Sequence, residues 1–193
     1  MRRSALVVVL SALLLSACGG LRYVQVSPEA KNFHPSRIGV LPADVGTYEE
    51  ARGVIDQVIA GVLMEKKWFK DVVGGDTIAN QLAANEELRQ VVGEYQAKLK
   101  SVNYSDPELS ARIGELARVD AFLIVNVDYW NYSLENEKKV AKVGLGMKLI
   151  DAATGKIIWK AGHHVAQDYI LFKPKLPDVA KDVVKAMIAE MPH

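Results

Sequence analysis

The sequence predicts an α/β fold: a single domain in which helices cover a mixed sheet of about five strands, with a C-terminal β-hairpin followed by a helix. Two observations predict it. Along residues 37–193, short apolar runs rich in β-branched side chains alternate with segments whose apolar residues recur every three or four positions. Half of the residues are hydrophobic, which is enough to fill one core.

The first half of this domain is expected to be mainly helical after one short buried strand. The segment after that strand carries its apolar residues on one broad stripe, with Thr47 as a candidate N-cap, and so predicts a helix packed on the sheet. Farther on, Asp106 before Pro107 is a typical helix start. The predicted elements are a strand at 38–41, a helix from Thr47 to about Lys66, a strand at 69–73, and helices at 76–82, 85–100 and 105–118.

The last third predicts the remaining strands and the closing helix. Residues 121–127 are almost wholly apolar and β-branched, which is typical of a central strand buried on both faces. Apolar residues alternate with lysine and glycine over 142–149. A turn at 151–155 then leads to a returning strand at 156–161, which completes a hairpin. Helical spacing over 179–188 predicts the closing helix.

The N-terminal residues carry the features of an exported lipoprotein. Two arginines precede an apolar run over 5–15, which has the length of a signal peptide and is too short to span ~30 Å of hydrocarbon. The run ends in Leu-Ser-Ala-Cys at 15–18. This tetrapeptide resembles the bacterial lipobox, which implies that Cys18 is acylated and becomes the first residue. The alternative is a secreted protein that is cut near Ala17 and keeps a free thiol.

The segment after Cys18 shows no sustained periodicity and is expected to be a tether with a reach of ~25 Å. In the alternative, residues 23–26 pair as a short strand and shorten this reach. Gly19 and Gly20 follow the cysteine where an aspartate would imply retention at the inner membrane, so the lipoprotein resemblance implies the periplasmic face of the outer membrane. The predicted organisation is a signal peptide at 1–17, a lipidated tether at 18–36 and the α/β domain at 37–193.

Charge and cysteine content narrow the classes of partner. Without residues 1–17, 176 of the 193 residues remain, with 22 basic and 23 acidic side chains. Such a balance supplies no strong overall field for nucleic acid or anionic lipid. If the single cysteine carries lipid, the fold contains no disulfide.

Three segments resemble the CsgG and LpoB-type periplasmic lipoproteins and a related set of lipoproteins of unassigned function. They are Arg-Ile-Gly-Val-Leu-Pro at 37–42, the strand within 119–130, and Lys-Leu-Ile-Asp-Ala-Ala-Thr-Gly-Lys-Ile-Ile-Trp within 147–159. The resemblance implies one of two roles. CsgG-like members are oligomeric secretion pores whose long hairpins build a barrel, whereas LpoB-type members bind and activate a cell-wall synthase.

The barrel-forming role is not expected for this chain. A barrel strand needs ~9 to 11 residues of alternating character. The residues between 127 and 143 are rich in Asn, Glu and Lys and are expected to form a polar loop.

Catalysis, a cofactor and a metal site are not expected either. The sequence contains no Gly-x-Ser-x-Gly, no phosphate-binding loop and no His-Glu-x-x-His. His163 and His164 are adjacent, so in a strand they point to opposite faces and do not hold one metal. Asp120 and Asp128 flank one strand, where solvated aspartates are common.

Two segments are candidate surfaces for a protein partner. Tyr129, Trp130 and Tyr132 cluster where a buried strand is expected to end, and large aromatic residues dominate binding hot spots. Their alternative role is to close the core. The second candidate consists of Ile170, Leu171 and Phe172, in an apolar segment before the last helix.

These observations predict a periplasmic lipoprotein that is anchored to the outer membrane through lipid on Cys18. Its expected role is that of a non-enzymatic protein-binding module, an adaptor or activator of an envelope assembly. The alternative is a subunit of an oligomeric envelope transport or secretion assembly that lacks its own barrel hairpins. The expected partner is therefore another envelope protein or a second copy of the chain, and not nucleic acid.

Overall fold

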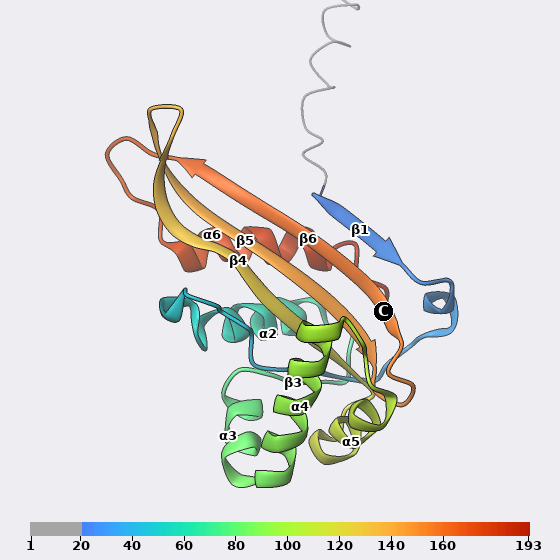
Figure 1. Ribbon diagram of the computed structural model, residues 1–193. Coiled ribbons are helices and arrows are strands. Elements are labelled where there is room, and N and C mark those ends of the chain that lie inside the picture. Colours follow the sequence, from blue (N-terminus) through green and yellow to red (C-terminus); the bar gives the residue numbers. More distant parts are fainter. Residues whose placement is uncertain (1–20) are drawn as a thin grey trace, which may run out of the picture.

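Six strands form one mixed sheet in the order β1-β6-β5-β4-β2-β3 (Figure 1). The computed structural model describes residues 21–193, so the predicted signal peptide and Cys18 lie outside the described residues. β2 runs parallel to β3 and β4, and the other neighbours are antiparallel. The strands are β1 (Tyr23–Val26), β2 (Arg37–Val40), β3 (Asp71–Val73), β4 (Ala121–Glu135), β5 (Lys138–Asp151) and β6 (Ile157–Asp168).

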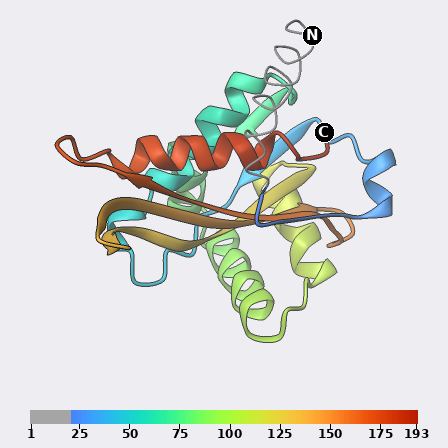
Figure 2. The same cartoon turned by 90° about the horizontal axis from the view of Figure 1, so that it is seen from above.

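Helices cover the two faces of this sheet unequally. In Figure 2, α2 and α6 lie over one face, whereas α4 and α5 lie on the other. The second group covers only the end of the sheet near β2 and β3, so much of that face over β5 and β6 has no helix on it (Figure 1). The α-helices are α2 (Val54–Lys66), α3 (Asp76–Ala84), α4 (Glu86–Val102), α5 (Pro107–Ala117) and α6 (Leu176–Ile188), with short 3₁₀ helices η1 (Pro28–Asn32) and η2 (Glu49–Ala51).

Two apolar clusters hold the helices to the sheet. The larger cluster joins α2 and α6 to alternate residues of β4 and β5, such as Leu123 and Leu145. The smaller cluster joins α3, α4 and α5 to Phe122 and Ile150, whose side chains point to the opposite face. This alternation is the period of two that a strand imposes on its side chains. The predicted single α/β domain, with a mixed sheet covered by helices, is confirmed.

The helix predicted to start after Thr47 begins later. Residues 49–51 form η2, and Gly53, with a φ of 72°, turns the chain into α2 without a side-chain cap. Glycine adopts this left-handed conformation without a steric penalty. By contrast, side chains cap α4 and α5. Asn85 accepts a hydrogen bond from Leu88 N at the start of α4, and Asp106 accepts from Glu108 N and Leu109 N at the start of α5.

The predicted polar loop between 127 and 143 is wrong, because β4 and β5 continue through it as one long hairpin. Their pairing extends to Glu135 and Lys138, and positive φ angles at Asn136 and Glu137 close the turn. A bulge at Asp128 shifts by one residue the alternation of side chains between the two faces of the sheet. The apolar positions before and after the bulge therefore do not follow one period of two. The sequence pattern therefore ends before the strand does.

The segment predicted as a tether contains two ordered elements. β1 pairs antiparallel with β6, with Tyr23 opposite Gly162 and Val26 opposite Trp159. This is the alternative in which residues 23–26 pair as a strand. η1 then returns the chain to β2, and Lys156 Nζ lies 3.0 Å from Glu29 Oε1.

Candidate functional site: the free end of the sheet

The distal parts of three strands form an extension that we call the sheet arm: residues 128–135 of β4, 138–144 of β5 and 163–168 of β6. Within the described residues, no strand pairs with β4 beyond residue 127 on the side opposite β5, and β1 stops at the level of Gly162. Both edges of the arm therefore offer backbone N–H and C=O groups that no neighbouring strand uses. α6 covers one face of this region (Figures 1 and 2).

The three aromatic residues predicted as one cluster lie on two faces of the arm. Trp130 is 5 % exposed and belongs to the larger apolar cluster, and Tyr132 packs against that cluster. Tyr129 points to the other face, where its ring covers Gly144 and Lys142 Nζ lies 4.3 Å from the ring centroid. The bulge at Asp128 produces this division, because it moves Trp130 to the core face. Trp130 is therefore a core residue, which is the alternative role considered for it.

Tyr132 holds the segment between β6 and α6, which we call the tip loop (residues 169–175). Its hydroxyl donates a hydrogen bond to Pro174 O at 2.7 Å, and its ring meets Tyr169 edge to face at 6.1 Å. Lys173 Nζ lies 3.4 Å from the centroid of the Tyr132 ring. At the N-terminal end of the loop, Tyr169 N donates a hydrogen bond to Lys139 O at 2.9 Å. Both ends of the tip loop are therefore fixed to the β4–β5 hairpin.

The second predicted surface, Ile170, Leu171 and Phe172, lies at the outer end of this loop. All three side chains are exposed. The fixed ends of the loop hold them away from the core, so they are available for contact with another molecule.

The histidine pair does not form a metal site. His163 lies opposite Leu145 on the core face and His164 lies opposite Gly144 on the other face, as adjacent strand residues must. Burial, together with His164, lowers the pKa of His163. Across residues 21–193, no group of three His, Cys, Asp or Glu side chains is placed to hold a metal ion.

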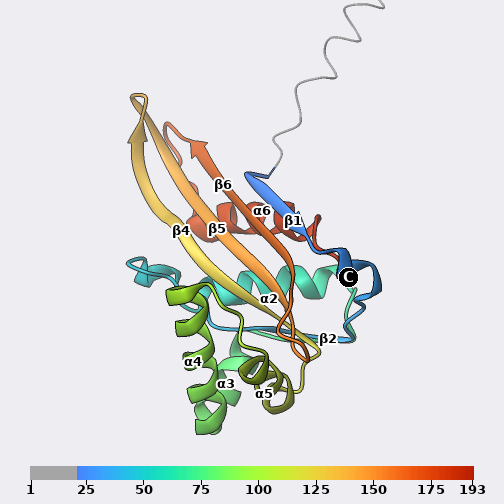
Figure 3. The same cartoon turned by 45° about the vertical axis from the view of Figure 1, so that its right-hand side comes forward.

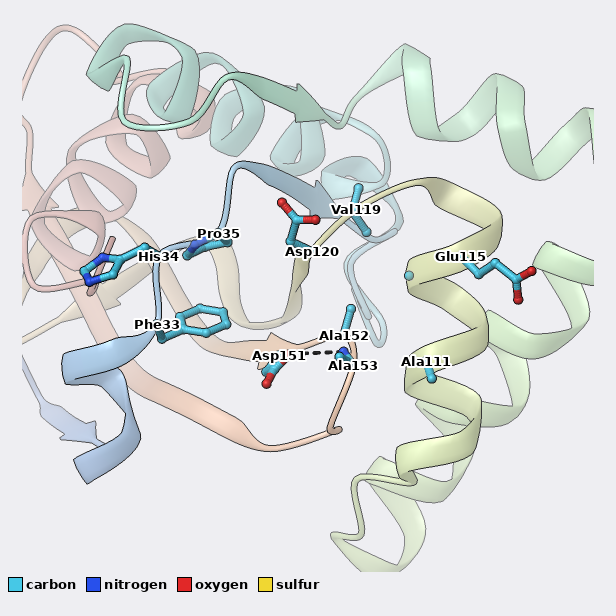
Figure 4. Close-up of a pocket in the computed structure, with 11 residues that line it drawn as sticks. Phe33, His34, Pro35, Ala111, Glu115, Val119, Asp120, Asp151, Ala152 and Ala153 are labelled. Atoms are coloured by element: carbon cyan, nitrogen blue, oxygen red, sulfur yellow. Dashed lines mark hydrogen bonds between the residues drawn. The ribbon is translucent and has the colours of Figure 1, made fainter.

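A cavity of about 580 Å³ lies between η1, α5 and the β5–β6 turn (Figure 4). Three carboxylates line it. Glu115 pairs with Arg112 on the same helix, and the two aspartates hold the fold together. Asp120 Oδ2 accepts hydrogen bonds from Ser36 N and Arg37 N, each at 2.8 Å. Asp151 accepts from Ala153 N at 3.0 Å. Asp128, the other aspartate that flanks the predicted strand, lies about eight residues farther along β4, or ~26 Å, and does not meet Asp120.

Sequence reasoning did not find a larger groove, of about 780 Å³, between α4 and β4. Lys100 Nζ lies 2.6 Å from Asp44 Oδ2 there and lowers the pKa of that carboxyl. Lys148 also lines the groove, and burial together with Lys160 on the next strand lowers its pKa. The groove is built from four separate segments of the chain, so no local motif marks it.

None of the helices within residues 21–193 combines the length and the apolar character needed to cross a membrane. Cys18, the predicted lipidation site, lies three residues before the first described residue.

The fold places the chain among α/β proteins with a long, partly uncovered hairpin. No protein-family model matches the sequence, and no curated protein matches it. The solved structures that resemble it therefore supply the comparison.

Three of these structures, each with a TM-score of 0.53, show the likeness. The PelC dodecamer from Paraburkholderia phytofirmans is 13 % identical over 86 % of this chain and 94 % of its own. Lipoprotein GNA1162 from Neisseria meningitidis is 18 % identical over 81 % of this chain and all of its own. The hypothetical protein CT253 from Chlamydia trachomatis is 7 % identical over 80 % and 94 %. At these low sequence identities, the likeness shows that the chains share a fold.

Proposed function

We propose that this protein is a lipid-anchored lipoprotein at the periplasmic face of the outer membrane that acts by binding another protein of the cell envelope and not by catalysis. The lipobox-like tetrapeptide at 15–18 supports the anchor. The fold shared with lipoprotein GNA1162 is consistent with it. The earlier resemblance to LpoB-type lipoproteins supports a binding role, as an adaptor or activator.

The observation that carries the binding role is the sheet arm. Among residues 21–193, no strand pairs with its two outer edges, residues 128–135 of β4 and 163–168 of β6. Proteins normally protect such edges, and an extended segment of a partner adds to them as a further strand. Lys142 and Glu135 pair on the arm, with Nζ and Oε1 2.7 Å apart, so the arm is an ordered surface for such a partner.

A photoreactive amino acid placed on each edge tests this function in the intact envelope. Ala166 represents the β6 edge and Asn131 the β4 edge. The control is the exposed Ala84, the last residue of α3, and α3 lies at the end of the molecule opposite the arm (Figure 1). We expect a cross-link to one defined envelope protein from an edge position and none from position 84. The same products from position 84, or none from either edge, would contradict the proposal.

The anchor is tested separately. The mass of the N-terminal peptide of the purified protein should show acyl chains on Cys18, and Cys18→Ala should release the protein from membranes. An unmodified N-terminus at a residue other than 18 would contradict the lipoprotein part of the proposal.

Self-assembly is a second candidate, favoured by the position of the two free edges on opposite sides of the arm. An interface between unlike edges of identical chains is head-to-tail, and such interfaces form rings where the rotation between neighbours closes and filaments where it does not. The PelC structure with the same fold is a dodecamer. Native mass spectrometry distinguishes the candidates, because a defined multimer of this chain alone would favour self-assembly over a separate partner.

A further inference from the structure

Four exposed apolar side chains gather at the end of the sheet arm. Ile170, Leu171 and Phe172 are 89, 86 and 89 % exposed, and Leu134 is 69 % exposed. The tip loop and the β4–β5 turn lie at the same end of the molecule in both Figure 1 and Figure 3. Single exposed apolar residues are ordinary, but a group of four at one protruding end indicates a contact surface.

The shape of this surface favours a lipid membrane as its partner. Tyr132 and its contacts to Tyr169 and Pro174 fix the two ends of the tip loop, so the three apolar side chains project from a firm base. Projecting side chains of this kind enter a lipid interface without needing a complementary pocket.

Basic residues surround the apolar group. Within the described part of the chain, Lys139, Lys173 and Lys175 make no ion pair with an acidic side chain. Lys138 is paired with Asp168, with 2.9 Å between Nζ and Oδ2. Glu135 is likewise paired, with Lys142. Within residues 21–193, the acidic residues near this end that make no ion pair are Glu137 in the turn, Asp178 in the first turn of α6, and Glu50, which lines a pocket with Tyr132. The tip loop and the β4–β5 turn themselves therefore carry three lysines and one glutamate without ion pairs beside the apolar group. Basic residues beside apolar ones are typical of contact with anionic phospholipid.

The chain length before β1 lets the predicted anchor come close to the level of the tip, a step that rests on the proposed lipidation of Cys18. Tyr23 lies opposite Gly162, and β6 continues for six residues to Asp168, a rise of ~20 Å. β1 is antiparallel to β6, so the chain before Tyr23 leaves the sheet toward the tip. The five residues back to Cys18 can span ~17 Å. Fully extended, the chain thus brings Cys18 to about 3 Å short of the level of Asp168, so lipid on Cys18 and the tip loop meet one membrane surface when the arm is tilted toward the β1 side.

We propose that the tip loop and the β4–β5 turn contact the phospholipid leaflet that holds the lipid of Cys18. Ile170, Leu171 and Phe172 enter the interface, and the neighbouring lysines face the anionic headgroups. Together with the anchor, this contact fixes the orientation of the sheet relative to the membrane and leaves the edges of the arm and the open face accessible.

The test uses the full, processed protein with Leu171→Cys, labelled with an environment-sensitive fluorophore and reconstituted in vesicles of phosphatidylethanolamine and phosphatidylglycerol. Acylated Cys18 does not react, so residue 171 is the one free thiol. Lipids with a quencher in the acyl chain are expected to remove most of the fluorescence from position 171. The control label at Ala84→Cys, at the opposite end of the molecule, is expected to keep its fluorescence.

A second variant tests the role of charge. Lys139→Gln, Lys173→Gln and Lys175→Gln in the same labelled protein should reduce the quenching severalfold, and so should replacing phosphatidylglycerol by phosphatidylcholine. Circular dichroism checks that each variant keeps its fold.

Three results would overturn the inference. The first is fluorescence at 171 that is no more quenched than at 84. The second is a label that becomes shielded from water as protein density rises, without quenching by lipid, since a second copy of the chain would then cover the loop. The third is quenching that does not respond to charge. If the N-terminal peptide shows no acyl group, the proposed function fails independently, and quenching at 171 is measured in a Cys18→Ala background mixed with the same vesicles.

Discussion

Trp130 packs among the apolar side chains that lie between the sheet and α6. Trp130→Ala removes a large buried side chain and leaves a cavity, so it should lower the free energy of unfolding by ~3–5 kcal/mol in urea denaturation. The matched control is Phe172→Ala, an exposed aromatic residue whose removal should change this free energy by less than ~0.5 kcal/mol. Equal effects of the two substitutions would show that Trp130 is not a core residue.

Asp56 makes the stability depend on pH. It is 8 % exposed, and its Oδ1 accepts a hydrogen bond from Ala43 N at 2.9 Å. Burial raises the pKa of this carboxyl above its ordinary value of 3.8, partly opposed by the Ala43 hydrogen bond. A raised pKa in the folded state favours the protonated form. The stabilising contribution of Asp56 is therefore complete below pH 3.8 and is lost as the pH rises through the folded-state value.

Asp56→Asn should remove this dependence, because the amide oxygen still accepts from Ala43 N but carries no charge. We expect the variant to match the wild type in urea denaturation near pH 3 and to be more stable than it at pH 7. Asp56→Ala is the control, since it should be destabilised at both pH values by the unpaired Ala43 N–H. A constant difference between Asn and Asp across this range would contradict the raised pKa.

At the scale of residues, the sequence could predict the cap of α5 but not which face of a strand a side chain lies on. Asp106 is expected at a helix start, and its side chain accepts the N–H groups of Glu108 and Leu109. Thr47, the other expected cap, does not cap α2, which begins after Gly53. The position of Trp130 depends on a bulge at Asp128, which forms only when β5 pairs beside it. The information for such a position lies in another segment of the chain.

At the scale of elements, β1 depends on a glycine of its neighbour. Gly162 lies under the ring of Tyr23, and a Cβ at this position would overlap that ring. Gly162→Ala should therefore push Tyr23 away and loosen β1, with a loss of ~1–3 kcal/mol. Hydrogen exchange at the amides of residues 23–26 should speed up more than at β5.

The double variant Gly162→Ala with Tyr23→Ala supplies the control. Removing the ring removes the overlap, so the added methyl group should cost less in the Tyr23→Ala background than in the wild type. If the two substitutions simply add, the contact between Tyr23 and Gly162 does not hold β1 in place.

The hairpin of β4 and β5 shows which elements a sequence pattern describes well. Their inner halves are buried on both faces or alternate cleanly, and residues 121–127 and 142–149 were expected as strands. Their outer halves have one covered face and one open face with Asn131 and Lys142, so few apolar residues mark them. Cross-strand pairing keeps these polar segments extended, and that pairing is a long-range effect.

At the scale of the whole molecule, the candidate site was predicted in part. Ile170, Leu171 and Phe172 are predictable as a surface because they stand in an apolar, proline-punctuated segment before the last helix, and the structure has them exposed. The free edges of the arm and the groove beside Lys148 are not predictable, because each arises from the relative lengths and positions of separate elements. The arm exists because β4, β5 and β6 extend farther than β1 and β2.

The two apolar clusters make a prediction for the whole domain. Ile55 in α2 and Ile113 in α5 are both fully buried but lie on opposite faces of the sheet. Ile55→Val and Ile113→Val should each lower the free energy of unfolding by ~0.5–1.5 kcal/mol. Because the sheet separates them, their effects should add to within ~0.5 kcal/mol in one cooperative transition. Ile59, one helical turn from Ile55 in the same cluster, provides the neighbouring pair for comparison. A coupling energy between Ile55 and Ile113 that exceeds the one between Ile55 and Ile59 would contradict the separation of the two clusters by the sheet. Two separate unfolding transitions would show that the two faces do not fold as one unit.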